Sequence, residues 1–328
     1  MKTTAQDRKQ LHSWYLKNKR SLPWRASQNP YLIWISEVML QQTTVTAVIP
    51  FYEKFIQRFP DVKTLANARI EDVYEYWAGL GYYSRARNLH KAATIVVDHY
   101  KAVFPRTYQE LIKLPGFGPY TSRAVASLAY NQPVGVLDGN VIRILSRKYG
   151  LDLKWWENKE KDKLQMISDE LAGTKDSADL NQAMMELGAT ICTPKKVMCL
   201  LCPWNKTCVS YATDTISQRP LSKPKADFEI WSWQFHINTK KSQIYLLPNA
   251  ETPFLKENWL PVSSATKLTK KPKDYHFKHG VTKYDIYITV TTGSKSSPKN
   301  GKWVNLDQVS QVNPTSLIKK IIKTIEEK

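Results

Sequence analysis

The sequence predicts an all-α domain followed by a smaller α+β domain. Residues 6–190 show the spacing of amphipathic helices, whereas residues 227–328 contain alternating apolar and polar stretches before one final helix. Between them, SQRPLSKPK (217–225) has the Pro, Ser and Lys content typical of a linker. A chain of 328 residues can hold two such domains, which we place at 1–210 and 227–328 with a linker at 211–226.

Regular spacing of apolar residues predicts the helices of the first domain, because side chains three and four positions apart share one helix face. Thr107 and Glu110 have the spacing of a capping box and open a further helix. Strand-like alternation is scarce in this domain. Helices are therefore expected near residues 6–18, 31–41, 70–79, 84–102, 121–130, 138–149 and 158–172.

Alternating residues predict strands in the second domain. The stretches DFEIWSWQFHI, QIYLLP and YDIYITVTT have this period of two. The last segment, NPTSLIKKIIKTIEE, is typical of a helix in which Asn313 is the cap and Pro314 the first residue. Its buried stripe would consist of Leu317, Ile318, Ile321, Ile322 and Ile325.

The chain is strongly basic over its whole length. Its net charge is +19, from 48 Lys and Arg against 29 Asp and Glu; residues 1–210 hold 29 and 19 of these (+10), and residues 211–328 hold 19 and 10 (+9). An excess of this size in both parts favours a polyanionic partner, most simply nucleic acid. No apolar stretch approaches the roughly 18 residues that span a bilayer, and the first 20 residues lack a signal-peptide core. We therefore expect a soluble cytoplasmic protein with no membrane association.

All the cysteines of the chain lie in the 17 residues CTPKKVMCLLCPWNKTC. In a reducing compartment, thiols clustered in this way are expected to be metal ligands. Four thiolates suit either one zinc ion or one 4Fe–4S cluster, and the spacing leaves both open. Lysines in the same segment (195, 196 and 206) would present positive charge to a phosphate. The predicted ligands are Cys192, Cys199, Cys202 and Cys208.

The stretch LPGFGPYTS (114–122) lies between two predicted helices. Gly116 and Gly118 would allow a tight turn with φ values that other residues avoid. The N–H groups of Gly116, Phe117 and Gly118 would then point out at the start of the next helix, where they attract a DNA phosphate. An ordinary helix–turn–helix corner has the same pattern, and the basic composition favours binding.

Two acidic residues stand in unusual surroundings. Glu37 lies in the apolar helical run WISEVMLQQT, where burial would raise its pKa and keep it protonated as a general acid, unless it is a surface or packing residue. Asp138 precedes a basic helix and is expected to cap it. One such carboxyl could protonate a leaving group while the other stabilises a cationic sugar, as in glycoside cleavage.

Together these motifs resemble the helix-hairpin-helix DNA glycosylase superfamily, in its iron–sulfur branch, and within it the MutY family of adenine glycosylases. The resemblance covers roughly residues 5–210. It implies a 4Fe–4S cluster on the four cysteines and a monomer that acts on double-stranded DNA containing an adenine mispair. It also implies base-excision repair, in which adenine opposite 8-oxoguanine or guanine is flipped out and hydrolysed from its sugar. The segments that carry it are LPWR, SEVMLQQT, GLGYYSRARNLHKAA, LPGFGPYTS, LDGNV and NQAMMELGATICTPKK.

The resemblance also implies roles for individual residues. Glu37 would protonate the adenine, and Asp138 would stabilise an oxocarbenium-like sugar, directly or through a transient covalent adduct. Tyr120 and Asn140 would support this step by hydrogen bonding. Gln42 and Tyr82 would fill the opened base stack, with Thr43 beside the oxidised base, and the adenine pocket would comprise Arg20, Leu22, Trp24, Arg25, Leu40, Val45 and Glu186.

Three features depart from relatives in informative ways. Bifunctional relatives resembling endonuclease III carry a lysine nucleophile where this chain has Tyr120, so we expect a monofunctional enzyme. The resemblance also implies a Nudix-like second domain that senses 8-oxoguanine through a Phe-Ser-His loop. Val281, Thr282 and Lys283 occupy those positions here, which puts the preference for 8-oxoguanine in question. The acid-rich helix of Nudix hydrolases is missing, so no pyrophosphatase activity is expected.

Two other functions compete with adenine removal. A thymine or other pyrimidine mismatch glycosylase of the endonuclease III type could use the same scaffold, but protonated release through Glu37 suits a purine. A non-catalytic iron–sulfur DNA-binding protein would keep the basic surface and the hairpin without needing both Glu37 and Asp138.

Overall fold

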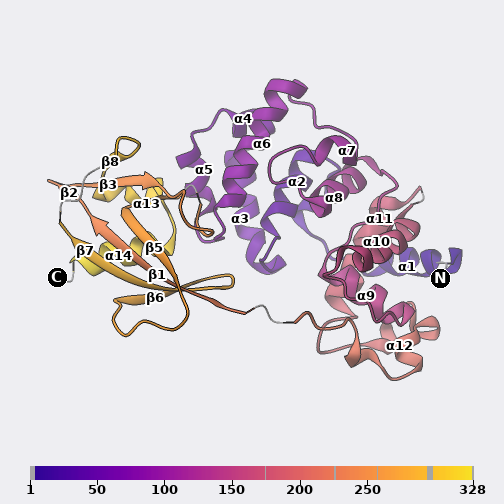
Figure 1. The fold of residues 1–328 in the computed structure, drawn as a ribbon. Helices are drawn as coiled ribbons and strands as arrows, with labels where there is room; N and C mark the ends of the chain where they lie inside the picture. Colours follow the sequence, from indigo (N-terminus) through magenta and orange to yellow (C-terminus); the bar gives the residue numbers. More distant parts are fainter. Residues whose placement is uncertain (1–3, 174, 225–226, 257, 294–297, 327–328) are drawn as a thin grey trace. The chain divides into compact units, whose positions relative to one another are not determined.

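The chain divides into two compact units in a computed structural model (Figure 1). The first comprises Met1–Ala68 and Ser84–Pro224, and the second Arg69–Tyr83 and Lys225–Lys328. The division after Pro224 falls inside the predicted linker, whose last residues, 225 and 226, lie outside the described residues. Inclusion of Arg69–Tyr83 in the second unit has no signal in the sequence. The structure describes residues 4–173, 175–224, 227–256, 258–293 and 298–326.

The described part of the first unit is helical, and its only β feature is the isolated bridge Cys192–Val197. The predicted helices are present with ends displaced by two residues at most, although the one expected near 70–79 is α5 and belongs to the second unit. No helix in the described ranges is both long and apolar enough to cross a membrane. The elements are α1 (Ala5–Asn18), η1 (Pro23–Arg25), α2 (Pro30–Met39), α3 (Val45–Arg58), α4 (Val62–Ala66), α6 (Ser84–Tyr100), α7 (Tyr108–Leu111), α8 (Pro119–Tyr130), α9 (Gly139–Tyr149), α10 (Asn158–Ala172), α11 (Ser177–Thr190), η2 (Cys199–Leu201), η3 (Asn205–Thr207), α12 (Val209–Ala212) and η4 (Ile216–Gln218).

Helix α2 lies at the centre of this unit. It begins at Pro30, with the Asn29 side chain accepting a hydrogen bond from the Tyr31 N–H at 2.9 Å. Residues 33–39 are all buried, because α2 packs against α8 while η1, α3 and α6 also contact it. Helix α11 packs in turn against α1, α8 and α9. A polar residue anywhere in positions 33–39 of α2 is therefore buried.

The predicted glycine hairpin joins α7 to α8. Gly116 has φ +78°, and a Cβ there would lie 2.9 Å from the Asn88 Cβ, so the position requires glycine. Gly118 has φ −83° and open space where a Cβ would lie, so the expected need for glycine there is wrong. Phe117 is buried and stacks on Trp34, with ring centroids 5.3 Å apart. Its side chain anchors the hairpin to α2. Thr107 caps α7 as predicted, accepting a hydrogen bond from the Glu110 N–H.

Over its described residues, the second unit is a small α+β fold with two four-stranded sheets. The first sheet has the order β5–β1–β7–β6, in which β1 and β7 are parallel and pair Trp233 with Ile288. All three predicted strands are present as β1, β3 and β7. The elements are α5 (Ile70–Trp77), β1 (Glu229–Ile237), β2 (Thr239–Lys240), β3 (Gln243–Pro248), β4 (Trp259–Leu260), β5 (Val262–Leu268), β6 (Phe277–Val281), β7 (Tyr284–Thr292), β8 (Lys302–Asn305), η5 (Leu306–Gln308), α13 (Val309–Val312) and α14 (Ser316–Glu326).

Helix α14 supplies one side of the core of this unit. Its predicted stripe is present: Leu317, Ile318 and Ile321 are fully buried, with Ile322 and Ile325 packed beside them. The predicted start is wrong, because α14 begins at Ser316. Instead, the Asn313 side chain accepts from the Thr315 N–H at 3.1 Å and donates to the Trp259 carbonyl at 2.6 Å, which closes a turn before the helix.

Candidate active site

Glu37 is the buried acid that the sequence predicts. It lies on α2 with 5% of its surface exposed, and the Tyr120 hydroxyl donates a hydrogen bond to its Oε2 at 2.7 Å. Burial raises the pKa of Glu37 to about 7. The bond from Tyr120 and the charge of Arg25 oppose this rise, and the charge of Asp138 adds to it. The carboxyl is therefore poised to hold a proton near neutral pH.

Asp138 caps α9, as predicted. Its Oδ1 accepts from the Val141 N–H at 2.7 Å, and its Oδ2 accepts from the Asn140 side chain at 2.9 Å. Burial raises the pKa of Asp138, while these hydrogen bonds and the charge of Arg143 act in the opposite direction. The two carboxyls thus differ in kind, because Glu37 has one hydroxyl donor and Asp138 has two N–H donors at a helix N-terminus.

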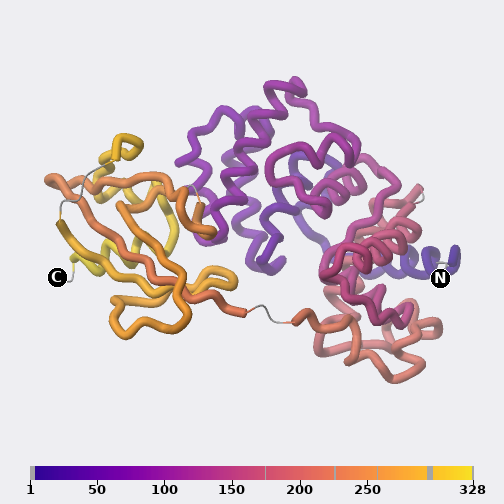
Figure 2. The backbone as a smooth tube through the Cα atoms, viewed as in Figure 1, coloured from indigo at the N-terminus to yellow at the C-terminus, as the bar shows by residue number. Residues whose placement is uncertain are grey.

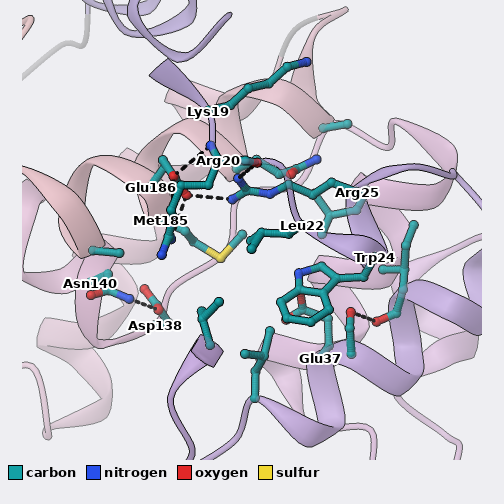
Figure 3. A pocket seen from close by; sticks show the side chains of 18 of the residues that line it. Lys19, Arg20, Leu22, Trp24, Arg25, Glu37, Asp138, Asn140, Met185 and Glu186 are labelled. Atoms are coloured by element: carbon teal, nitrogen blue, oxygen red, sulfur yellow. Dashed lines mark hydrogen bonds and ion pairs between the residues drawn. The ribbon is translucent and has the colours of Figure 1, made fainter. Parts of the chain in front are cut away.

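Both acids line one pocket of about 760 Å³ (Figure 3). This volume lies within the usual range for ligand sites, roughly 300–1,000 Å³. The predicted catalytic and substrate residues, apart from Tyr82, all line this pocket. They are Arg20, Leu22, Trp24, Arg25, Glu37, Leu40, Gln42, Thr43, Val45, Tyr120, Asp138, Asn140 and Glu186.

A third acid in the pocket has the opposite character. The Glu186 side chain is fully buried, yet both of its oxygens are paired with guanidinium groups (Figure 3). Arg20 binds it through two bonds of 2.6 and 2.9 Å, and Arg25 donates at 2.8 Å. Although burial works against ionisation, these pairings leave the pKa of Glu186 lowered overall. Glu186 is therefore an anion that holds the guanidinium groups of Arg20 and Arg25 at the wall of the pocket.

The residues predicted to enter the base stack have unusual backbones. Gln42 is exposed and lines the pocket. Its backbone has φ +60°, a value that residues other than glycine seldom adopt. Tyr82 has φ +48° and a 55% exposed side chain, but it belongs to the second unit and is not among the residues that line the pocket. Both positions hold strain of the kind concentrated at functional sites.

Sequence reasoning missed two contributors to this site. The Met185 sulfur lies 3.2 Å from the Tyr120 hydroxyl and lines the pocket. Arg143 donates to the Asn140 side chain at 2.8 Å and to the Cys192 carbonyl, also at 2.8 Å. Met185 directly precedes Glu186 in NQAMMELGAT, but a methionine on a helix is usually a core residue. Arg143 follows Asp138 by five residues, and only its contacts distinguish it from an ordinary helix arginine.

The four cysteines gather around one small pocket beside the C-terminal part of α9. Figure 2 traces the loop that carries them after α11 and returns through α12. Arg147 holds this loop, since its guanidinium donates to the Cys192 sulfur at 3.4 Å and to the Thr193 carbonyl at 2.8 Å. Cys192, Cys199, Cys202 and Cys208 all line the pocket.

Within the part of the chain that the structure describes, no group of three or more His, Cys, Asp or Glu side chains is placed to hold a metal ion. Four ligands of one zinc ion must lie within about 4 Å of each other, because each Zn–S bond is about 2.3 Å. A 4Fe–4S cluster takes one thiolate on each of four irons and spaces them more widely. Four thiolates that line one pocket suit either group.

Helix α9 connects the two sites. Asp138 caps its first turn, Arg143 reaches the Cys192 carbonyl from its middle, and Lys148 near its end donates to the Thr207 carbonyl at 3.0 Å. Lys148 also forms a buried ion pair with Asp7 of α1 at 2.8 Å. The cysteine loop is therefore fastened to the helix that positions one of the two acids.

The predicted sensing loop joins β6 to β7 in the second unit. Thr282 has φ +50° in this tight turn. The Lys283 ammonium pairs with Glu229 at 2.5 Å, and Glu229 also binds Lys267 at 3.0 Å. Because Lys283 is 47% exposed, its pairing is solvent-screened and open to exchange.

A helical unit with a glycine hairpin, and a pocket that holds one buried carboxyl of raised pKa and one helix-capping carboxyl, defines a helix-hairpin-helix DNA repair protein. Residues 35–171 match the family of HhH-GPD superfamily base excision DNA repair proteins. Among solved structures, a thermostable thymine-DNA glycosylase is 28% identical with a TM-score of 0.58, covering 63% of this chain and 95% of that one. An endonuclease III–DNA complex shares the fold at 23% identity and a TM-score of 0.53, covering 65% of this chain and 99% of that one.

Curated relatives narrow the class. The chain is 33% identical to the adenine DNA glycosylase of Buchnera aphidicola subsp. Schizaphis graminum, over 95% of this chain and 96% of the relative. It is 39% identical to the adenine DNA glycosylase of Mus musculus, over 73% of this chain and 47% of the relative. The chain belongs to the adenine DNA glycosylase family.

Proposed function

We propose that this protein is a base-excision repair enzyme that removes adenine mispaired with 8-oxoguanine or guanine in double-stranded DNA. The observation that carries the proposal is a single pocket lined by both Glu37 and Asp138, with the pKa of Glu37 raised to about 7. Adenine is a poor leaving group until a ring nitrogen is protonated, and an acid of this pKa is half protonated at neutral pH.

The proposed reaction begins when the adenine is flipped into the pocket. Glu37 gives its proton to a ring nitrogen, the glycosidic bond breaks with its electrons going to the base, and the sugar gains positive charge. Asp138, held by Asn140 and the Val141 N–H, faces that charge as an anion and stabilises it, directly or through a transient bond to the sugar. Water then attacks the sugar carbon, displacing the Asp138 carboxylate where a bond to it has formed, and the proton that this water loses returns to Glu37 through solvent.

The walls of the pocket suit a flat purine. Trp24 is buried and held edge-on by Tyr52, with ring centroids 5.3 Å apart, while Leu22, Leu40 and Val45 supply apolar surface. Glu186 with Arg20 and Arg25 forms a charged edge that can hydrogen-bond the base. A thymine glycosylase would have no use for a protonated acid, since release of a pyrimidine anion gains little from it. This favours adenine over the alternative.

Adenine release from defined duplexes tests the function. We expect alkali-labile sites at adenine opposite 8-oxoguanine or guanine, with no strand break before alkali treatment. Because Tyr120 supplies no amine, lyase activity should be weak at most, and borohydride should not trap a protein–DNA adduct efficiently. Release of thymine, or efficient trapping, would contradict this proposal.

The four cysteines are proposed to bind a 4Fe–4S cluster, one iron to each thiolate. When bound, the cluster would cross-link the loop that presents the exposed Lys195, Lys196 and Lys206, so that these cations meet the DNA backbone. We expect the purified protein to be brown, with absorbance near about 400 nm and about four irons per chain. Cys202→Ser should lose most of this absorbance, whereas a colourless protein with one zinc per chain would refute the assignment.

The β6–β7 turn is proposed to contribute weakly to recognition of 8-oxoguanine. Lys283 pairs with Glu229 and can at most exchange that partner for a phosphate, while Thr282 offers one hydroxyl. Single-turnover rates on the two mispairs should therefore differ by about the same factor in wild type and Lys283→Ala. Lys283→His, which restores an imidazole, should raise the preference for 8-oxoguanine. A large loss of preference in Lys283→Ala would instead make this lysine a principal sensor.

A further inference from the structure

The Tyr120 hydroxyl has more acceptors than it can serve. Its oxygen lies 2.7 Å from Oε2 of Glu37 and 3.2 Å from the sulfur of Met185. A tyrosine hydroxyl carries one hydrogen, so it donates to one of the two at a time. Burial keeps the pKa of Tyr120 well above its ordinary value, and the hydroxyl keeps its hydrogen throughout.

The charge on Glu37 decides which acceptor is stronger. An ionised carboxylate forms a charge-assisted hydrogen bond that a thioether cannot match. A neutral carboxyl has lost that advantage, and a thioether at van der Waals distance becomes a competing acceptor. Met185 lies on α11 with its sulfur directed into the pocket (Figure 3), so it faces the hydroxyl without obstructing the acid.

This inference rests on the proposed function. We propose that Met185 is a positioning residue whose sulfur accepts the hydrogen bond of the Tyr120 hydroxyl when Glu37 is protonated. The hydroxyl rotates and no O–H bond is broken. The carboxyl is then released from Tyr120 and free to aim its proton at the purine. When Glu37 has given up that proton, the hydroxyl returns and stabilises the carboxylate.

The direction in which loss of the Met185 sulfur shifts the ionisation of Glu37 follows from comparing the ionised and protonated forms of Glu37. With an ionised Glu37, Tyr120 donates to the carboxylate whether or not the sulfur is present. With a protonated Glu37, the sulfur offers a second acceptor, and this stabilises only the protonated form. Removing the sulfur should therefore favour ionisation and move the loss of activity to lower pH. Other titratable or charged groups that face Glu37 are Asp138 at the start of α9 and Arg25 of η1, and neither is altered by the change.

Met185→Leu is the test, because leucine preserves the apolar volume and lacks the acceptor. Single-turnover adenine release should show the upper pH limb lowered by about 0.5 unit. Met184→Leu is the matched control: Met184 is fully buried on the same helix, and the limb should not move. In a Tyr120→Phe background, Met185→Leu should have no further effect on the limb.

The outcomes distinguish failure of the Met185 inference from failure of the proposed function. An unchanged or raised limb in Met185→Leu would overturn the inference, as would an equal shift in the Tyr120→Phe background, because the sulfur would then act through burial alone. If wild type releases no adenine at any pH, the proposed function itself is wrong, and the question of Met185 falls with it.

Discussion

Replacing Glu37 with Gln is expected to slow adenine release by about 10²- to 10⁴-fold. Gln keeps the shape of the side chain and can still accept the hydrogen bond from Tyr120, but it has no acidic proton to give. Single-turnover rates at saturating enzyme measure the effect. DNA binding should stay within a few-fold of wild type, and Glu53→Gln, at an exposed position of α3, should leave the rate unchanged.

The same residue sets the upper limit of the pH profile. Because the pKa of Glu37 is raised to about 7 and the proposed mechanism uses its protonated form, activity should fall as pH rises through that value. The pKa of Asp138 is also raised, so the lower limb should lie above the ordinary value for an aspartate. A rate that keeps rising well above pH 7 would exclude Glu37 as the proton donor.

Replacing Asp138 with Asn is expected to slow adenine release by at least about 10²- to 10³-fold. Asn is as good a helix cap as Asp, and its oxygen can still accept from the Val141 N–H, so α9 should remain intact. The variant loses the negative charge that the proposed mechanism places beside the sugar, and it loses the acceptor for the Asn140 amide. The rate is compared with that of Asp98→Asn, an exposed aspartate on α6.

Stability separates this result from misfolding. The melting temperature of Asp138→Asn should be close to that of wild type, because removal of a buried charge offsets loss of the Asn140 hydrogen bond while the cap is kept. If the variant is folded and retains its rate within a few-fold, Asp138 is a structural cap with no electrostatic role, and the proposed mechanism fails.

The local features of the site are those that the sequence predicted well. Glu37 stands in an apolar run, and its burial follows from the central place of α2. Asp138 precedes a helix, and a residue of that type at that place is a cap. Gly116 has the positive φ that a hairpin glycine implies. Each of these depends on a few neighbouring residues, which a pattern can encode.

Features that depend on distant packing escaped prediction. Phe117 belongs to the glycine hairpin but is buried against Trp34, more than 80 positions earlier in the chain. The contact between Met185 and Tyr120 joins residues 65 positions apart, and no local pattern marks it. Asn313 caps a turn ahead of α14 because its amide is drawn to the Trp259 carbonyl. Such contacts follow from the tertiary fold, which the spacing of residues along the sequence does not reveal.

The central claim is that Glu37 carries a proton near neutral pH in the pocket it shares with Asp138. ¹³C NMR of protein labelled at the glutamate carboxyl carbon measures this directly, with the Glu37 signal identified by its loss in Glu37→Gln. The expected midpoint of its titration is about 7. A midpoint near 4.5, the ordinary value for this side chain, would contradict the claim, because Glu37 would then be ionised at neutral pH and have no proton to donate.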